Sequence, residues 1–523
     1  WQARAARQEM ARADRVKEFL VDLLHQADPN VTQGKEFTVR ELLDRGTHRV
    51  DSMLGREPRV QAELYELIGN TYAHLGLADQ ADTLHRKGLA VIRALYGPGD
   101  PEVLDQEMAV AWGLNDRGRY RDADSLLTRA LASYQAAGGP ESQALSDAID
   151  ILGTAKKRLD QQAAAESLYR RSLAMQIRLT GASDTITASR LSDLGVLLGG
   201  QNRLVPAESA LVAAQAHRRG VLDPLDVRYL VGEASLASVM MKRGDLAGAE
   251  PRLTTALAGL RQVEKNGDLN LARTLDRMAL LQFLQMHVAA TIRTGEMAHD
   301  MFVTRMGDDH PETLNNLSAL AWYRSASGDS NVRKAANLAY EGLRLKLGDR
   351  HDWTLLAGQR LCAILLRAGQ FAQARSIDDV TLATVRDKYE HLPPAFAGLI
   401  ATQAQLLEIR GDSSAADTSF REALGSLTGG TRVDSAAYPG ILTQYAELLA
   451  ARGNLQAAGS MLRQALAFFP AGGDSSEVTS VEARRELALV ISSATSHPQS
   501  RIEPTKAGGP SKPARVPTGV RGN

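Results

Sequence analysis

The densest group of potentially reactive side chains lies in the segment GDDHPETLNNL, residues 307–317. Asp308, Asp309, His310 and Glu312 stand within five consecutive residues. Carboxylates next to a histidine can hold a divalent metal ion, or can act as a general acid and a general base. The same residues could equally join two helices, and the two interpretations differ in whether the segment is unique or recurs.

Segments with glycines and acids do recur in the same phase along the chain. They are GPGDPEVL (97–104), GASDTITA (181–188), LDPLDVRY (222–229) and GDRHDWTL (348–355). Residues 307–314 are therefore interpreted as one of several joints between repeated units. His310 and its counterpart His351 are then loop residues, and neither is a catalytic or metal-binding candidate.

Helix-end chemistry explains the other residues of this joint. We expect Gly307 to end the preceding helix, and Asp308 or Asp309 to cap the next one. Pro311 suits the first turn of a helix because it lacks an amide proton, and Glu312 suits the positive end of the helix dipole.

Other signatures of catalysis or cofactor binding do not occur in the sequence. The eleven histidines form no HExxH motif, and the single cysteine, Cys362, excludes a disulfide framework and any multi-cysteine metal site. There is no glycine-rich phosphate loop, Walker lysine, GxSxG elbow, HRD motif or DFG motif. We predict no catalytic residue, no metal and no cofactor, and hence a chain that is not an enzyme.

Composition and charge restrict the partners. The 523 residues exceed what one core usually holds, and the 61 basic and 61 acidic residues give zero net charge. Zero net charge gives no argument for a nucleic-acid partner. The sequence contains no apolar run long enough for a membrane helix, and it begins with Trp1, so we expect a piece of a longer protein.

Small residues recur with a period of 42. One position runs through Ala81, Ala123, Ala165, Ala207, Ala249, Thr291, Ala335, Ala374, Ala416 and Ala458, with a two-residue insertion before Ala335. A second position, twelve residues earlier, runs through Gly69, Ala111, Gly153, Gly195, Ala237, Ala279, Ala321, Cys362, Ala404 and Ala446. A third, seven residues after the first, includes Ala130 and Gly342. Small residues let helices approach closely where they cross, so each period is interpreted as two helices.

A short turn containing glycine or asparagine separates the two helices of a unit. The turn residues are Gly76, Gly118, Asn202, Gly244, Gly328, Gly369, Gly411 and Gly453. One helix pair cannot bury its apolar face alone, so the pairs must stack. We predict an all-α fold, a right-handed α-solenoid of about ten helix-turn-helix repeats over residues 60–470.

The first repeat carries a family pattern. Tyr65, Ile68, Gly69, Tyr72, Ala81 and Gly88 stand at the offsets of the tetratricopeptide repeat, which this region resembles. The period of 42, with GDDHPETLNNLSALA before a first helix, is similar to the kinesin-light-chain variety of that repeat. The resemblance implies a non-catalytic scaffold that binds protein or peptide.

Residues 1–59 are predicted to form a membrane-proximal or capping segment of two helices. The first, residues 1–26, is apolar at Val16, Phe19, Leu20, Leu23 and Leu24, and the second starts near Thr38. FLVDLL and TVRELLDRG, followed by EPRVQAELYELIGNTYAHLG, resemble the segment after the membrane helix of bacterial serine/threonine kinases with a C-terminal repeat array. That resemblance implies a kinase domain and a membrane helix upstream of Trp1, and an extracytoplasmic position for this region.

The C-terminal end is predicted to leave the repeat pattern. Residues 471–492 are expected to form a capping helix, and residues 493–523, rich in Pro, Gly, Ser and Lys, to be disordered. Basic residues outnumber the single acid, Glu503, in this tail. A solvated tail is the simpler interpretation, and weak contact with an acidic partner is the alternative.

The first helix of each pair is expected to line the concave face of the array. The candidate groove residues are Glu63, Glu66, Asn70, Asp105, Trp112, Asn115, Asp147 and Asp150, with Asn315, Trp322 and Arg324 in the seventh unit. Five carboxylates beside asparagines and a tryptophan suit an extended, somewhat basic peptide on which Trp112 stacks. The alternative is that they form ordinary solvated helix faces.

Three functions are thus open. The first is a peptide-binding scaffold that forms the sensory or docking region of a membrane-anchored kinase. The second is a stand-alone scaffold or regulator of the cytoplasm without a kinase. The third, an enzyme, is disfavoured because the polar residues follow the phase of the repeats and do not converge on one pocket. The sequence identifies neither the ligand nor the oligomeric state.

Overall fold

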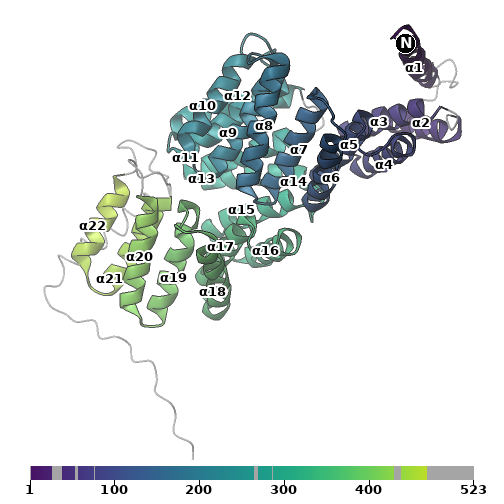
Figure 1. Ribbon diagram of the computed structural model, residues 1–523. Coiled ribbons are helices and arrows are strands. Elements are labelled where there is room, and N and C mark those ends of the chain that lie inside the picture. Colours follow the sequence, from purple (N-terminus) through teal and green to yellow (C-terminus); the bar gives the residue numbers. More distant parts are fainter. Residues whose placement is uncertain are drawn as a thin grey trace, which may run out of the picture. The chain divides into compact units, whose positions relative to one another are not determined.

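The computed structural model describes residues 2–25, 38–53, 57–75, 77–263, 269–285, 287–428 and 437–467. These ranges hold twenty-two α-helices and two short 3-10 helices, η1 (Ser330–Val332) and η2 (Pro394–Phe396) (Figure 1). The α-helices are α1 (Gln2–His25), α2 (Val39–Met53), α3 (Pro58–His74), α4 (Ala78–Leu95), α5 (Pro101–Asp116), α6 (Tyr120–Ala136), α7 (Gln143–Arg158), α8 (Gln162–Thr180), α9 (Thr185–Gly200), α10 (Leu204–Arg218), α11 (Val227–Lys242), α12 (Leu246–Val263), α13 (Leu269–Leu284), α14 (Val288–Met306), α15 (Pro311–Ala326), α16 (Arg333–Leu347), α17 (Asp352–Arg367), α18 (Phe371–Lys388), α19 (Ala397–Ile409), α20 (Ser413–Leu427), α21 (Ala437–Ala451) and α22 (Leu455–Leu466). The prediction of an all-α fold of paired helices is confirmed. The chain divides into two compact units, Trp1–Ile441 and Leu442–Asn523.

Small residues hold the two helices of a repeat together, as the period predicts. In the third repeat, a Cβ atom added to Gly153 on α7 would lie 2.8 Å from the ring of Tyr169 on α8. In the fourth, a Cβ on Gly195 would lie 2.8 Å from the side chain of Leu211. Neither position has room for a methyl group, because a large side chain of the second helix already fills the space.

The turns inside the repeats use the left-handed backbone conformation. The predicted turn residues that the structure describes all have positive φ: Gly118, Asn202, Gly244, Gly328, Gly369, Gly411 and Gly453. Gly76 lies outside the described residues. Asp160, in the α7–α8 turn, adopts the same conformation with φ of 60° although it is neither glycine nor asparagine. Its side chain also forms an ion pair with Lys388 of α18.

The joints between repeats are closed by side-chain N-caps, and here one prediction is wrong. His310, not Asp308 or Asp309, caps α15, because its Nδ1 accepts a hydrogen bond of 3.1 Å from the amide of Glu312. Only the residue directly before the first helical residue, Pro311, can place its side chain over that amide. Asp309 instead forms an ion pair with Lys346.

The same joint position is used along the chain. Asp100, Asp184 and Asp226 accept from the amide two residues ahead, and His351 does so through Nδ1 at 3.1 Å. The helix-ending role predicted for Gly307 is confirmed, since it is the C-cap of α14 with φ of 87°.

The phase assigned to the seventh repeat also needs correction. Ala335 and Gly342 are only partly buried, whereas Ala336 and Leu343, each one residue further along, are buried. The 3-10 helix η1 opens the second helix of this repeat and shifts the register of its buried face. The insertion before this helix is therefore one residue longer than the sequence pattern indicated, and the small residue at the repeat position is Ala336.

Helices α1 and α2 cover the start of the repeats in unit Trp1–Ile441. Phe19 and Leu23 of α1 are buried in one cluster with Leu64 and Ile68 of α3. Thr38 begins α2 with reciprocal bonds to Glu41: its hydroxyl accepts from the Glu41 amide at 3.2 Å, and the Glu41 carboxylate accepts from the Thr38 amide at 2.9 Å.

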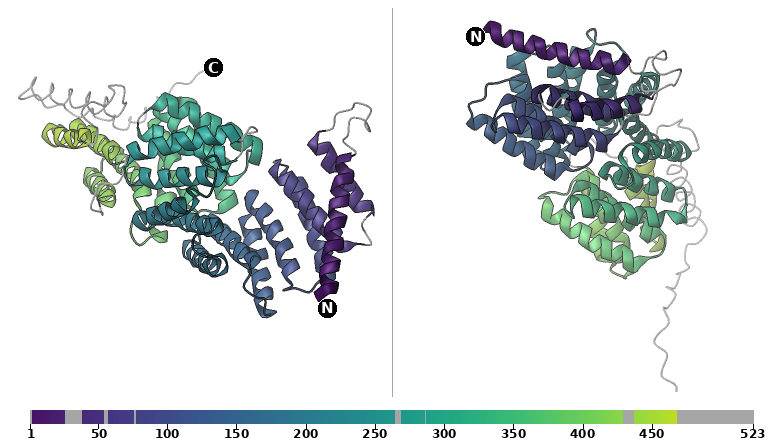
Figure 2. Two further views of the ribbon diagram at one scale, coloured as in Figure 1. Left: turned by 90° about the horizontal axis from the view of Figure 1, so that it is seen from above. Right: turned by 90° about the vertical axis from the view of Figure 1, so that its right-hand side faces the viewer.

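Later repeats of this unit contact earlier ones. Tyr120 at the start of α6 shares a buried cluster with Leu314 of α15. A Cβ on Gly118, in the α5–α6 turn, would lie 2.7 Å from Cδ of Pro311. The start of α15 therefore lies against the α5–α6 turn within this unit, and both elements can be found in Figure 1 and Figure 2.

In unit Leu442–Asn523 the structure describes residues 442–467, which hold most of α21 and all of α22. The small residues Ala446 and Ala458 are fully buried there, as the repeat pattern predicts. The predicted capping helix at 471–492 and the predicted disordered tail at 493–523 lie outside the described residues.

Candidate functional site on the inner face

Glu312 is the centre of the contact between distant repeats. Its carboxylate lies 2.5 Å from Nη2 of Arg158 at the end of α7, and 2.8 Å from Nε of Arg273 on α13. The Glu312 side chain is 8 % exposed. Burial alone would raise the pKa of Glu312, but the two guanidinium groups outweigh it and hold that pKa well below its usual range.

Two histidines of the joints reach the same region. His351 uses Nδ1 to cap α17, and its Nε2–H donates to the carbonyl oxygen of Arg158 at 2.9 Å. These two bonds fix its neutral Nε2–H tautomer. His310 is 3 % exposed, and burial lowers its pKa to about 4 despite the nearby Glu312 carboxylate.

A third contact comes from the end of α18. Lys388 forms an ion pair with Asp160 in the α7–α8 turn, and a second one with Asp352 at 2.7 Å. Its ammonium also donates to the carbonyl oxygen of Arg350 at 2.8 Å. The ion pair between Lys388 and Asp160 gives a role to the aspartate of the α7–α8 turn, a position that is glycine or asparagine in other repeats.

Charged side chains from separate repeats meet across the interior of the unit. We call the following residues the central charged cluster: Asp116, Lys157, Arg158, Asp193, Arg273, Arg277 and Glu312. Lys157 on α7 interacts electrostatically with Asp193 on α9 and with Arg273 on α13, and Arg277 on α13 interacts with Arg158. Helices α7 and α13 belong to the third and sixth repeats, so these interactions join first helices that are not neighbours in the stack.

Two cations of this cluster form no direct ion pair. Over the ranges that the structure describes, neither Lys157 nor Arg277 has a side-chain oxygen at ion-pair distance, whereas Arg158 and Arg273 both bind Glu312. The Lys157 ammonium lies 5.7 Å from the centre of the Tyr169 ring. Burial, with Arg158, lowers the pKa of Lys157, and burial, with Arg273, lowers the pKa of Arg277 to about 10. An anionic ligand would stabilise the charged forms of both Lys157 and Arg277.

The predicted groove residues of the first repeat are mostly engaged by the chain itself. Glu63 forms an ion pair of 3.0 Å with Arg12 of α1. Glu66 accepts a hydrogen bond from Gln106, and burial raises its pKa. The amide oxygen of Asn70 lies 3.1 Å from Nε2 of His85.

The third repeat is similar. Asp147 and Asp150 both bind Arg190 of α9, Asp150 at 3.0 Å. Burial and the Asp193 carboxylate nevertheless raise the pKa of Asp150 to about 8. These carboxylates connect adjacent repeats and are not free acceptors.

The second repeat keeps accessible side chains. Trp112 is 56 % exposed, and it lies close enough to the Asp116 carboxylate to favour the ionised form of that group. Asp105 has no partner among the described side chains, and burial, together with Glu102 and Asp147, raises its pKa. Asn115 is engaged, donating to the carbonyl oxygen of Ile151 at 3.2 Å.

The three predicted residues of the seventh repeat lie on α15 but make different contacts. Asn315 is partly buried and its amide oxygen has no hydrogen-bond partner. Trp322 is partly buried with the guanidinium of Arg367 at 4.6 Å from its ring centre. Arg324 forms an ion pair with Glu296 of α14, so its charge is already matched within the chain.

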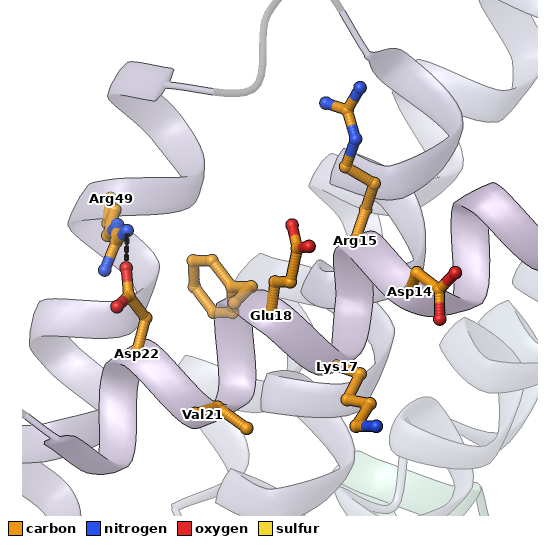
Figure 3. A pocket seen from close by; sticks show the side chains of 8 residues that line it. Asp14, Arg15, Lys17, Glu18, Val21, Asp22 and Arg49 are labelled. Carbon is orange, nitrogen blue, oxygen red and sulfur yellow. Dashed lines mark hydrogen bonds and ion pairs between the residues drawn. The ribbon is translucent and has the colours of Figure 1, made fainter.

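A second polar surface lies on α1 and α2. Its lining includes Arg15, Glu18, Phe19, Asp22 and Arg49. Figure 3 shows Arg15, Glu18 and Asp22 on α1, with Arg49 of α2 paired to Asp22. The surface is mixed in charge, and its cations Arg49 and Arg15 are already paired, with Asp22 and Glu57 respectively. It has no feature that selects a ligand.

The described residues contain neither a cluster of metal ligands nor a membrane-spanning helix. Over residues 2–467, apart from the gaps given above, no three His, Cys, Asp or Glu side chains gather as metal ligands. No helix in those ranges is long and apolar enough to cross a membrane.

The helix pairs have a recognisable sequence family in part of the chain. Residues 60–136 match a family model described as tetratricopeptide repeat. This range covers most of α3 and all of α4 to α6, the repeats that carry Trp112 and three of the five predicted groove carboxylates, Glu63, Glu66 and Asp105. The expected resemblance to this repeat is thus confirmed for these two units. No curated protein matches the chain.

Solved structures share the helical architecture at low identity. BtubC (BKLC) from P. vanneervenii is 22% identical, with a TM-score of 0.37 over 44% of this chain and 94% of its own. A putative kinesin light chain with TPR-like repeats from Podosopora anserina is 17% identical, with a TM-score of 0.33 over 40% of this chain and 99% of its own. A Rap protein complexed with Competence and Sporulation Factor is 13% identical, with a TM-score of 0.46 over 76% of this chain and 99% of its own. None of these likenesses is close enough to bear on function.

The tetratricopeptide pattern did not reveal the central charged cluster, although the sequence holds a signal for it. Asp193 and Arg277 each stand two residues before a small residue of the first helix, at Gly195 and Ala279. In the first repeat the same offset carries the apolar residue Leu67. The third repeat, which supplies Lys157 and Arg158, has Ile151 at that offset, so the signal identifies only part of the cluster.

Proposed function

We propose that this chain is a non-catalytic scaffold that binds a peptide or protein segment on the inner face of its helical repeats. One observation carries the proposal: Lys157 and Arg277 come from the third and sixth repeats, both lie near Arg158 and Arg273, and neither forms an ion pair with a described residue. The nearby carboxylates, Asp193 and Asp150 for Lys157 and Asp276 and Glu312 for Arg277, act on them only from longer range. Partly buried cations without a counter-ion are unfavourable in the free protein, and a ligand carboxylate would stabilise them.

The geometry supports a ligand with an acidic group and an apolar group. The acidic group would bind between Lys157 and Arg277, and the apolar group would stack on the exposed ring of Trp112. The basic peptide expected from the sequence is the second candidate, and Asp105 supports it, since that carboxylate has no partner in the chain's described residues. The other four groove carboxylates are held by Arg12, Gln106 and Arg190.

Selection from a random peptide library displayed on phage tests this proposal without a known partner. We expect the selected peptides to be enriched in Asp or Glu beside an aromatic or aliphatic residue. Hydrogen exchange with such a peptide should show protection in α5, α7 and α13. A library that gives no binder, or binders that protect only the outer helices such as α6 and α8, would contradict the proposal.

We further propose, on the sequence resemblance alone, that the scaffold is the sensory or docking arm of a membrane-anchored bacterial serine/threonine kinase. The supporting residues are FLVDLL in α1 and TVRELLDRG at the start of α2. In that case the inner face lies outside the cytoplasm; otherwise the chain is a cytoplasmic scaffold without a kinase. Reading the coding DNA upstream of Trp1 separates the two, since only the first requires an apolar span of about twenty residues preceded by HRD and DFG motifs.

A further inference from the structure

One repeat carries a carboxylate at a position that is apolar in most others. The residue four places after the first small residue of the second helix packs into the repeat core. It is Leu127, Tyr169, Leu211, Leu253, Tyr340, Phe420 or Leu462 in seven repeats, and all seven are buried. In the eighth repeat the same position is Asp378, which is 1 % exposed. A lone aspartate in place of leucine weakens the core, so a compensating role is expected.

Asp378 has no hydrogen-bond partner for its buried Oδ1, and no described side chain forms an ion pair with it. The neighbouring Cys362 thiol donates instead to the carbonyl oxygen of Ala374, at 3.2 Å. Burial, and then the Asp379 carboxylate, raise the pKa of Asp378 to about 7. The other polar residue at this repeat position, His85, differs because Asn70 lies 3.1 Å from its ring nitrogen.

Asp378 lines a cavity of about 260 Å³ between α18 and α19, two helices that Figure 1 shows in green beside one another. Apolar side chains form one wall of it: Phe371, Leu406, Leu407 and Ile409. Phe371 is 44 % exposed and Ile409 is 52 % exposed, so the cavity opens to solvent along an apolar edge.

The charged groups around Asp378 leave it available. Asp379 is already paired with Arg375 at 3.5 Å on the same helix. Arg386 interacts with Asp378 only at a distance, and itself hydrogen-bonds Glu422 at 3.2 Å. Arg410 lies on the cavity lining but is exposed, and it makes no ion pair with Asp378.

We propose that this cavity binds an arginine side chain of a partner protein, with the guanidinium on Asp378 and the aliphatic stem along the apolar wall. Arginine fits better than lysine, because its planar group can stack on the Phe371 ring while it donates to the carboxylate. The site is separate from the inner face, since its residues lie on α18 and α19 and not on α7 or α13. A scaffold with both sites would hold a partner at two points.

The test uses the full chain and two labelled pentapeptides, Gly-Leu-Arg-Leu-Gly and the same peptide with citrulline, the neutral analogue of arginine. Fluorescence anisotropy should show at least about tenfold tighter binding of the arginine peptide, because citrulline lacks the charge that Asp378 requires. Near pH 6 the binding should also release protons, detectable by calorimetry in two buffers, because the guanidinium lowers the pKa of Asp378 from its raised value.

Three variants locate the effect. Asp378→Leu restores the pattern of the other repeats, so it should raise the melting temperature and reduce arginine-peptide binding to the citrulline level. Asp378→Asn keeps the side-chain shape and should also lose the preference. Asp300→Asn, an exposed carboxylate on α14, should change nothing. Equal binding of the two peptides to the unmodified chain, no binding at millimolar peptide, or an unchanged preference in Asp378→Leu would each overturn the proposal.

Discussion

His351 and Arg158 lie 193 residues apart in the sequence and are joined by a hydrogen bond of 2.9 Å from Nε2 to the backbone carbonyl oxygen. The histidine also caps α17, so one neutral ring closes a helix end and connects distant repeats. In a simple stack each repeat contacts only its neighbours. Here the contacts of His351, Glu312 and Lys388 add a second set of interfaces, which holds the first helices around the central charged cluster.

Removing the Glu312 carboxylate should loosen this second set of interfaces. Glu312→Gln leaves Arg158 and Arg273 without their shared anion, and breaking a buried pair destabilises by about 3 kcal/mol. Urea unfolding should show this loss in the free energy of unfolding. The control is Glu296→Gln, whose pair with Arg324 is 41% exposed on both sides and should contribute less than about 1 kcal/mol. Equal losses in the two variants would show that the contact through Glu312 is not special.

Stability should fall on mild acidification because of His310. Its pKa is lowered to about 4 in the folded chain, against 6.5 for an ordinary histidine. Between these pH values the unfolded chain binds a proton that the folded chain excludes, so the contribution is complete above pH 6.5 and is lost as the pH falls towards 4. The full effect of this one group is on the order of 3 kcal/mol.

The groups around His310 support that sign and supply the control. Burial and the cations Arg158 and Arg273 oppose protonation of His310, and together they outweigh the Glu312 carboxylate, which favours it. Protonation of Nδ1 would also remove the N-cap of α15. His310→Asn keeps a capping oxygen but does not titrate. Melting temperatures from pH 7.5 to 4.5 should therefore fall less steeply in this variant, and parallel curves would contradict the assignment.

A substitution at Asp160 can remove the contact with α18 without changing the conformation of the α7–α8 turn. Asp160→Gly preserves the left-handed turn, which glycine adopts without strain, but removes one partner of Lys388. We expect hydrogen exchange to accelerate at the end of α18, corresponding to about 1–2 kcal/mol for a lost charged hydrogen bond. The α7–α8 turn should keep its protection. Unchanged exchange near Lys388 would mean that its pair with Asp352 is sufficient.

The sequence predicts the features that recur in every repeat, but it does not predict contacts between repeats that are far apart in the chain. The positions of Gly153 and Gly195 could be inferred because close helix packing imposes the same small residue every period. The pairing of Arg158 with Glu312 could not, because it depends on small rotations between successive repeats that no residue pattern records. The sequence predicts Asp308 or Asp309, and not His310, as the N-cap of α15, because aspartate is the commoner N-cap residue and two aspartates precede His310.

The candidate site shows the same division. The first helices do carry the accessible residues Asp105 and Trp112 at predicted positions. Their neighbours Glu63, Glu66, Asp147 and Asp150 have the predicted residue types, but they are already bound by Arg12, Gln106 and Arg190 from other helices. A charge count on one helix face cannot reveal these partners.

The most direct test of the inner-face proposal is the affinity of one selected acidic peptide for the chain and for its Arg277→Glu variant. Fluorescence anisotropy should show at least about tenfold weaker binding to the variant, since a charge-assisted contact becomes a repulsion. A peptide with its acidic residue replaced by lysine should regain affinity for the variant, and the matched change Arg375→Glu on α18 should leave the acidic peptide bound as before. Unchanged affinity of the acidic peptide for Arg277→Glu would contradict the proposal that the inner face is the binding site.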